Sequence, residues 1–99
     1  MIHEIATLTV NPDAAAAFEE AVASCTPLFR EAEGCRSMRL DRELERPGRY
    51  LLVVGWDRVE DHMETFRRSP AFARWREVVG GFFVEAPSVV HVELATEHF

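Results

Sequence analysis

Residues 50–56 read YLLVVGW, and this stretch decides the fold. A strand with one face in water alternates between apolar and polar residues, whereas this one is apolar on both sides. Pro47 and Gly48, just before it, favour a turn. We therefore predict a central strand over residues 50–56 that is covered on both faces.

The segment before this turn has the alternating pattern that the central strand lacks. Between residues 35 and 45, apolar Met38, Leu40 and Leu44 point one way, and polar Ser37, Arg39, Asp41 and Glu43 point the other. This alternation predicts a strand with one face in water. The turn then makes the two strands antiparallel neighbours.

The N-terminal part of the chain predicts a strand followed by a helix. Residues 2–10 are rich in β-branched types, which favour a strand. Asn11 can cap a helix whose first residue is Pro12, where a missing N–H has no consequence. A continuous apolar stripe follows as far as Gly34, which ends the helix, and Pro27 should kink it.

The C-terminal half predicts two further helices and a last strand. Asp57 and Glu60 are spaced as a capping box for a short helix. Ser69 can cap the next helix, with Pro70 at its first position and Gly80-Gly81 at its end. The last strand is expected over residues 89–95.

This order of elements predicts an α+β fold of the ferredoxin-like type. Residues 1–99 should form one domain, a four-stranded antiparallel sheet with helices on one face. No element is left to cover the other face. A second copy of the same sheet is the simplest cover, so we expect a homodimer whose two sheets form one α+β barrel.

Composition and charge exclude several classes of protein. The chain is 47% hydrophobic and 28% charged, as in an ordinary globular protein, and its net charge of −6 would repel a nucleic acid. The apolar run at 50–56 is too short to span a bilayer, so we expect no membrane partner. The N-terminus carries no basic export signal. We expect a cytoplasmic protein in which Cys25 and Cys35 are reduced thiols.

The motifs of the common catalytic and metal sites are missing. His3, His62, His91 and His98 are not paired at metal-binding spacing, and no carboxylate–histidine cluster is evident. His3 and His91 are interpreted as ordinary sheet residues. The chain also lacks the glycine-rich loops of nucleotide sites and the G-x-S-x-G stretch of serine hydrolases. We expect neither a metal nor a nucleotide cofactor.

Two polar groups interrupt helix faces that are otherwise apolar. At helical spacing, His62 falls among Val59, Met63 and Phe66, and Arg76 falls among Phe72, Trp75 and Val79. A cation is costly to bury without a partner, so Arg76 either reaches the rim or faces a polar ligand. The neighbouring aromatic residues are either plain core or the lining of a site for a small planar ligand.

Three segments resemble one known family. The block YLLVVGWDRVEDHMETFRRSPAFARWREVVGGFF (50–83), the opening MIHEIATLTVNPDAAAAFEEAV (1–22) and the link FREAEGCRSM (29–38) are similar to antibiotic biosynthesis monooxygenase (ABM) domain proteins. The resemblance covers essentially the whole chain. It implies a dimeric α+β barrel, in agreement with the order of elements above.

The cofactor-free members of that family oxidise aromatic polyketide phenols to quinones with molecular oxygen. Their tryptophan at the strand end corresponds to Trp56, and their active-site arginine to Arg76. Their tyrosine six residues after the tryptophan corresponds to His62, which can also move a proton. Their asparagine four residues before the tryptophan corresponds to Leu52, a departure that removes an amide able to orient substrate or oxygen.

The haem-degrading relatives match this chain less well. Their helix tryptophan corresponds to Thr65 or Phe66, and their axial histidine to Trp75 or Arg76. Asn11 lies past the strand and is better explained as a cap. The resemblance therefore disfavours haem breakdown.

The resemblance implies a monooxygenase that acts on an electron-rich aromatic or quinol-like molecule with molecular oxygen and without a cofactor. Arg76 would hold a phenolate or enolate, and His62, with an ordinary pKa near ~6.5, would move the proton. The Trp56 indole N–H would donate to a substrate oxygen. The substrate ring would pack against Leu52, Phe66, Phe72 and Trp75.

Two other functions remain open from the sequence. One is a non-catalytic dimer that binds a small apolar metabolite, which the Leu52 departure favours. The other is an isomerase of small oxygenated metabolites, because folds of this kind host several chemistries. Oxygen uptake with a quinol substrate would separate the oxygenase from both.

Overall fold

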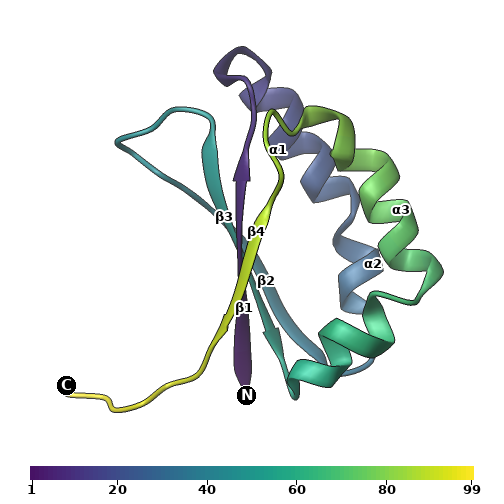
Figure 1. Cartoon of the computed structure of the whole chain (residues 1–99), viewed down its shortest axis with the longest axis vertical. Helices are drawn as coiled ribbons and strands as arrows, with labels where there is room; N and C mark the ends of the chain where they lie inside the picture. The colour runs from purple at the N-terminus through teal and green to yellow at the C-terminus, as the bar shows by residue number, and fades with distance from the viewer.

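A four-stranded antiparallel sheet forms one layer of the molecule in a computed structural model that describes residues 1–99 (Figure 1). The strand order is β2-β3-β1-β4, so the sheet has the ferredoxin-like arrangement predicted from the sequence. The strands are β1 (Ile2–Thr9), β2 (Cys35–Arg42), β3 (Arg49–Trp56) and β4 (Ser88–Val92). Strand β3 pairs with β1 and β2, which confirms the central position of residues 50–56.

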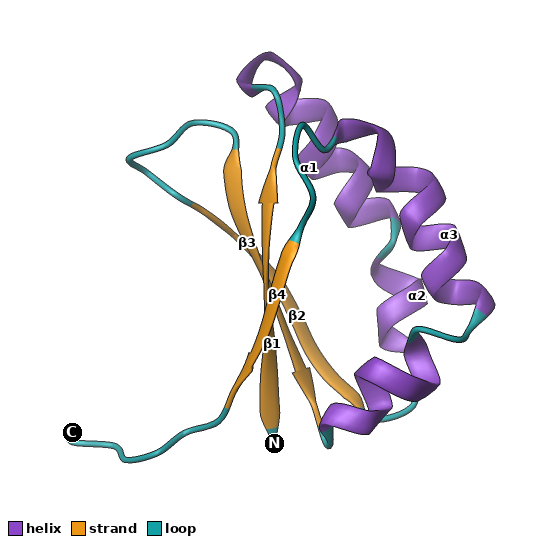
Figure 2. Cartoon of the chain, in the orientation of Figure 1, coloured by secondary structure: helices purple, strands orange, loops and turns teal.

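All helices lie on one face of this sheet (Figure 2). They are α1 (Ala15–Ser24), α2 (Thr26–Arg30), a π-helix (Asp61–Phe66) and α3 (Pro70–Val79), with 3-10 turns at Pro12–Ala14 and Gly80–Phe82. None of them combines the length and the apolar character needed to cross a bilayer. The core lies between this helix layer and the sheet.

The core is built from alternate residues of the two central strands. On β3, the side chains of Tyr50, Leu52, Val54 and Trp56 face the helices and are at most 2% exposed. Phe18 of α1 packs against Tyr50 with ring centroids 5.1 Å apart. Removing such apolar groups from water is the main stabilising contribution to a fold of this size.

The first predicted helix is divided into two. Asn11 is a cap, as expected, because its side chain accepts a hydrogen bond from the Asp13 N–H at 2.9 Å. The break lies at Cys25, just ahead of Pro27, because the ring of a proline cannot follow a continuous helical turn. Gly34 ends the segment with φ of +78°, and a Cβ there would meet the buried carboxylate of Asp61.

Three expectations about the later segments are wrong in detail. Leu44 is 84% exposed, because β2 already ends at Arg42 and the chain then leaves the sheet. Asp57 does not cap a helix; its carboxylate instead forms a bidentate ion pair with Arg36 at 2.6 and 2.9 Å. Strand β4 ends at Val92 rather than at residue 95.

The short second helix is a π-helix rather than an α-helix. The Arg67 N–H donates to the His62 carbonyl at 3.1 Å, five residues back instead of four. Such wide turns recur at functional sites because they turn side chains out of the normal helical register. The next helix begins as predicted: Ser69 Oγ accepts a hydrogen bond from the Phe72 N–H at 3.3 Å, and Pro70 is the first helical residue.

The second face of the sheet carries no helix, so nothing within one chain covers it (Figure 1). Arg39, Val53, Ile5 and Val90 are successive partners across the sheet and share this face. Val90 is 55% exposed and its neighbour Val92 is 46% exposed. The residues after β4 run away from the body of the molecule as an extended tail (Figure 1).

Candidate functional site

A cavity of about 440 Å³ opens between the helix layer and the sheet. It is the largest hollow of the molecule, since the next measures about 290 Å³. Its volume lies within the usual range of ~300–1,000 Å³ for small-molecule sites. Its polar lining consists of Glu4, His62, Arg67 and Arg76, and apolar side chains form the rest of its walls.

The structure brings most of the predicted site residues to this cavity. Those that line it are Leu52 from β3, His62 from the π-helix, and Phe72, Trp75 and Arg76 from α3. Trp56 and Phe66 do not line it. They are 0% and 3% exposed and pack against each other behind the wall, with ring centroids 5.3 Å apart.

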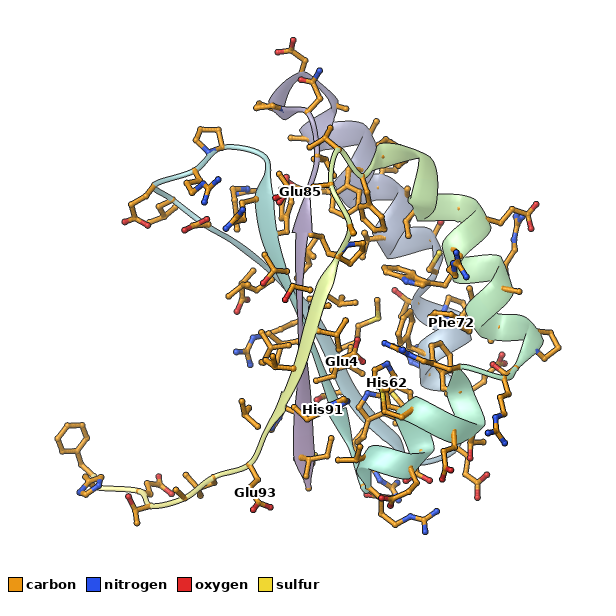
Figure 3. The ribbon with its side chains drawn as sticks, in the orientation of Figure 1. Glu4, His62, Phe72, Glu85, His91 and Glu93 are labelled. Atoms are coloured by element: carbon orange, nitrogen blue, oxygen red, sulfur yellow. The ribbon has the colours of Figure 1, made fainter.

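Glu4 and His62 form the floor of the cavity (Figure 3), and Trp56 is fully buried and does not line it. The Trp56 indole N–H donates to Glu4 Oε1 at 3.0 Å, and His62 Nε2 lies 3.3 Å from the same oxygen. The Trp56 and His62 rings are stacked, with centroids 5.4 Å apart and an interplanar angle of 22°. The indole N–H is therefore already used, and the expectation that it donates to a substrate oxygen is wrong. A carboxylate–histidine cluster also exists where none was evident from the sequence.

The Glu4 carboxyl group is held on one side only. Oε1 has two polar neighbours, Trp56 and His62. Oε2 has no hydrogen-bond partner in the protein, and it is not completely buried. Burial raises the pKa of Glu4, and the Trp56 hydrogen bond and the charge of Arg67 partly oppose this effect. The group is therefore a stronger base than an exposed carboxylate, with a free oxygen available to a ligand.

His62 is a neutral ring at neutral pH. Burial is the main cause that lowers its pKa to about 4, and the charges of Arg67 and His91 contribute. The ordinary pKa assumed from the sequence is therefore wrong for this site. His62 Nδ1 lies 2.9 Å from His91 Nε2, so both of its ring nitrogens have a polar neighbour. A proton can pass through His62, but the ring does not carry a stable charge.

Two cations stand at the mouth of the cavity. The guanidinium carbons of Arg67 and Arg76 each lie 5.9 Å from the centroid of the Phe72 ring, a distance that allows a cation–π contact. Both side chains line the cavity and both residues are exposed, so Arg76 reaches the rim. Neither is within ion-pair distance of a carboxylate, whereas Arg74 on the same helix pairs with Glu77 at 3.3 Å. The mouth can thus accept an anionic group.

Sequence reasoning missed Glu4, Arg67 and His91. Glu4 could have been found, because it is the single acid among the alternate, inward-facing residues of β1. Arg67 could not, because its place on the cavity depends on the wide turn of the π-helix. His91 was interpreted as an ordinary sheet residue, and only the folded structure places it against His62. No group of three or more His, Cys, Asp or Glu side chains is arranged to hold a metal ion.

Comparison with known families and proteins gives a consistent result. The family model described as "Antibiotic biosynthesis monooxygenase" matches residues 1–78. The Bacillus subtilis protein YczJ, itself described as uncharacterized, is 30% identical over 93 residues, which cover 94% of this chain and 98% of YczJ.

Solved structures agree with this match. A Bordetella bronchiseptica protein with a provisional assignment as an antibiotic biosynthesis monooxygenase is 45% identical, with a TM-score of 0.93 over 96% of this chain and 97% of its own. A mutant of SnoaB, described as a cofactor-independent oxygenase from Streptomyces nogalater, is 16% identical with a TM-score of 0.79, over 97% of this chain and 94% of its own. At that identity the second likeness shows the fold alone.

Proposed function

Because the chain belongs to the antibiotic biosynthesis monooxygenase family, we propose that it is a monooxygenase acting on an electron-rich aromatic or quinol-type molecule. The co-substrate is molecular oxygen, and no cofactor takes part. A deprotonated phenol can itself give electrons to oxygen. One oxygen atom becomes a carbonyl of the product, and the other leaves as water with the hydrogens that the substrate has lost.

The observation that carries this proposal is the buried Glu4 carboxyl group on the floor of the cavity, whose Oε2 has no hydrogen-bond partner in the protein. A hydroxyl group of the substrate placed there meets a buried carboxylate whose affinity for a proton is raised. Glu4 is then the group that accepts the proton, and His62 orients it through Oε1. This differs from the expectation that His62 alone moves the proton.

The mouth of the cavity supplies the opposite charge. Arg76, joined by Arg67, holds the phenolate or another anionic oxygen of the substrate beside the Phe72 ring. Trp75 and Leu52 form apolar walls against which the ring packs.

The Leu52 departure fits this arrangement. Leu52 is buried at 2% exposure and offers the substrate only apolar contact. In the sheet, Leu52 is the partner of Ala6, and Glu4 lies two residues further along β1. We propose that the polar function lost at Leu52 is supplied from this neighbouring strand, by Glu4.

The functional unit proposed is a homodimer formed through the open face of the sheet. Val53, Ile5 and Val90 form an apolar row on that face, and nothing else in the chain covers it. A specific interface buries more than ~1,000 Å². Sedimentation at micromolar concentration should give a dimer, and Val90→Asp should shift it to monomer. A wild-type protein that sediments only as a monomer contradicts the dimer.

Oxygen consumption tests the proposed activity. The purified protein should take up oxygen with at least one member of a panel of anthrones, naphthols and quinols, and mass spectrometry with ¹⁸O₂ should show one labelled oxygen in the product. Glu4→Gln should abolish uptake, and Glu20→Gln, an exposed glutamate on α1, is the matched control. Tight binding of panel members without oxygen uptake would instead indicate a non-catalytic binding protein.

A further inference from the structure

We infer that Glu4, His62 and His91 form a proton relay that joins the floor of the cavity to water at the outer edge of the sheet. His91 is its outer end. This inference rests on the proposed function, in which a proton must leave the substrate and a proton must later return to reduced oxygen.

The geometry of the relay is continuous. Glu4 and His91 are direct partners across β1 and β4, so both side chains rise from the same face of the sheet. His62 descends from the π-helix between them, with Nε2 at 3.3 Å from Glu4 Oε1 and Nδ1 at 2.9 Å from His91 Nε2 (Figure 3). A proton crossing from Glu4 to His91 therefore makes two hops: the second follows a hydrogen bond, and the first spans 3.3 Å, slightly beyond the usual hydrogen-bond length, so this pair must close a little for transfer.

The two ends of the chain open in different directions. Glu4 lines the cavity, whereas His91 belongs to the edge strand β4, does not line the cavity and is only half-buried. His91 Nδ1 has no hydrogen-bond partner in the protein, and it is not one of the polar atoms that are completely buried without a partner. Water can therefore reach this nitrogen without passing through the cavity.

With Glu4 protonated, the chain has two arrangements that hold the same number of protons. In the first, Glu4 Oε1–H donates to His62 Nε2, His62 Nδ1–H donates to His91 Nε2, and His91 Nδ1–H faces water. In the second, every bond is reversed, so that His91 donates to His62, His62 donates to Glu4 Oε1, and Glu4 Oε2–H faces the cavity. In either arrangement both rings carry their hydrogen on the same type of nitrogen.

Passage between the two arrangements moves one proton and leaves no charge behind. When the first becomes the second, the substrate hydroxyl gives its proton to Oε2, the hydrogens of Oε1 and His62 Nδ1 each move one place along, and His91 Nδ1 releases a proton to water. The return passage takes a proton from water and delivers one from Oε2 to the oxygen-derived anion. One turnover thus restores the relay.

The surroundings favour a relay without charged members. Burial lowers the pKa of His62 and His91 and raises that of Glu4, which disfavours the charged form of each group. Arg67, after the π-helix, is the charged group that faces all three, and it further disfavours a charged imidazole. Trp56 donates to Glu4 Oε1 and keeps the carboxyl group in place.

The resting protein tests the relay without any substrate. In ¹⁵N–¹H correlation spectra at neutral pH, His62 and His91 should both be neutral and should share one tautomer, either both Nε2–H or both Nδ1–H. A doubly protonated His62, or opposite tautomers in the two rings, overturns the inference. This measurement tests the His62–His91 link of the relay even if no substrate for the enzyme is found, and the link to Glu4 is tested by turnover.

Turnover supplies the second test. His91→Ala should lower kcat by about 10²-fold or more, within the range that a proton-transfer group contributes, and leave substrate affinity unchanged. Added imidazole should restore the rate in proportion to its concentration, which a purely structural role would not produce. His98→Ala, an exposed histidine outside the relay, is the matched control. If His91→Ala leaves the rate unchanged, or if the rate falls and imidazole does not restore it, the relay is overturned. Either outcome leaves the oxygenase proposal intact.

Discussion

The floor and the mouth of the cavity hold their charged groups in opposite ways. At the floor, Glu4 and His62 are 5% and 2% exposed, and the carboxyl group is fixed by Trp56 through a hydrogen bond of 3.0 Å. At the mouth, Arg67 and Arg76 are exposed and have no carboxylate partner. Burial thus changes the proton affinity of the floor groups, whereas the exposed arginines have no partner in the protein and are free to bind an anion.

This difference indicates that the floor of the cavity carries the chemistry and that the mouth selects the ligand. A buried group acts strongly because water does not screen it, and its removal affects both reaction and folding. An exposed cation acts weakly and is screened by salt. Substitutions at the floor should therefore have large effects that depend on pH, and those at the mouth should have small effects that depend on salt.

The largest effect is expected at Glu4. Glu4→Gln preserves the shape of the side chain but removes the base, so kcat should fall by ~10²- to 10⁴-fold. The melting temperature should stay close to that of the wild type, because the amide oxygen can still accept the Trp56 N–H. Steady-state oxygen uptake and thermal melting, measured together, check this. Equal losses in Glu4→Gln and in the exposed control Glu20→Gln would contradict a special role for the floor.

A smaller effect is expected in the pH dependence of stability. The pKa of His62 is lowered to about 4, so the unfolded chain binds a proton at this residue more readily than the folded chain does. Its contribution to stability is present above the ordinary histidine pKa and is lost as the pH falls toward 4. Between pH 7 and pH 5 this loss should amount to about 2 kcal/mol.

Urea unfolding of the wild type and of His62→Gln at both pH values measures this loss. The His62→Gln protein should lose less stability than the wild type over the same interval, because glutamine does not titrate. The raised pKa of Glu4 works in the opposite sense, since its ionisation on raising the pH destabilises the fold, and it affects both proteins alike. Equal pH dependence of the two proteins would contradict the neutral, buried His62.

The smallest effect is expected at the mouth. Arg67→Leu and Arg76→Leu should each weaken the binding of an aromatic carboxylate by up to about fivefold, because an exposed ion pair contributes ~0–1 kcal/mol. The affinity for the neutral parent ring should change much less. Added salt should reduce the difference, and the melting temperature should not move.

Titration calorimetry with 1-hydroxy-2-naphthoate and 1-naphthol provides this comparison. Arg68→Leu is the matched control, since Arg68 is exposed but does not line the cavity. A loss of binding that is the same for the acid and the neutral ring would show that the arginines act through packing and not through charge.

Much of the fold could be predicted from local patterns. The central strand and the Asn11 and Ser69 caps depend on residues close together in the chain, whereas the helix expected to run to Gly34 already ends at Arg30. The errors lie where an interaction over distance overrides a local signal. Asp57 has the spacing of a cap, yet its partner is Arg36, which lies 21 residues earlier.

The candidate site was predictable only in part. Helical spacing and the family resemblance both selected His62 and Arg76, and both line the cavity. The resemblance also selected Trp56, which is completely buried and donates its N–H to Glu4. A resemblance between motifs identifies which positions matter, but it does not say which atoms of a side chain are still free.

The sequence by itself determined the order of elements, the inward and outward faces of the strands and the family, because these follow from periodicity, caps and motifs along the chain. Only the tertiary structure decided the chemistry of the floor. Residues 4, 62 and 91 lie on three different elements, and sheet register together with the wide turn of the π-helix brings them within hydrogen-bond reach. Their proton affinities then depend on burial, which is a property of the packed molecule and not of any local stretch of residues.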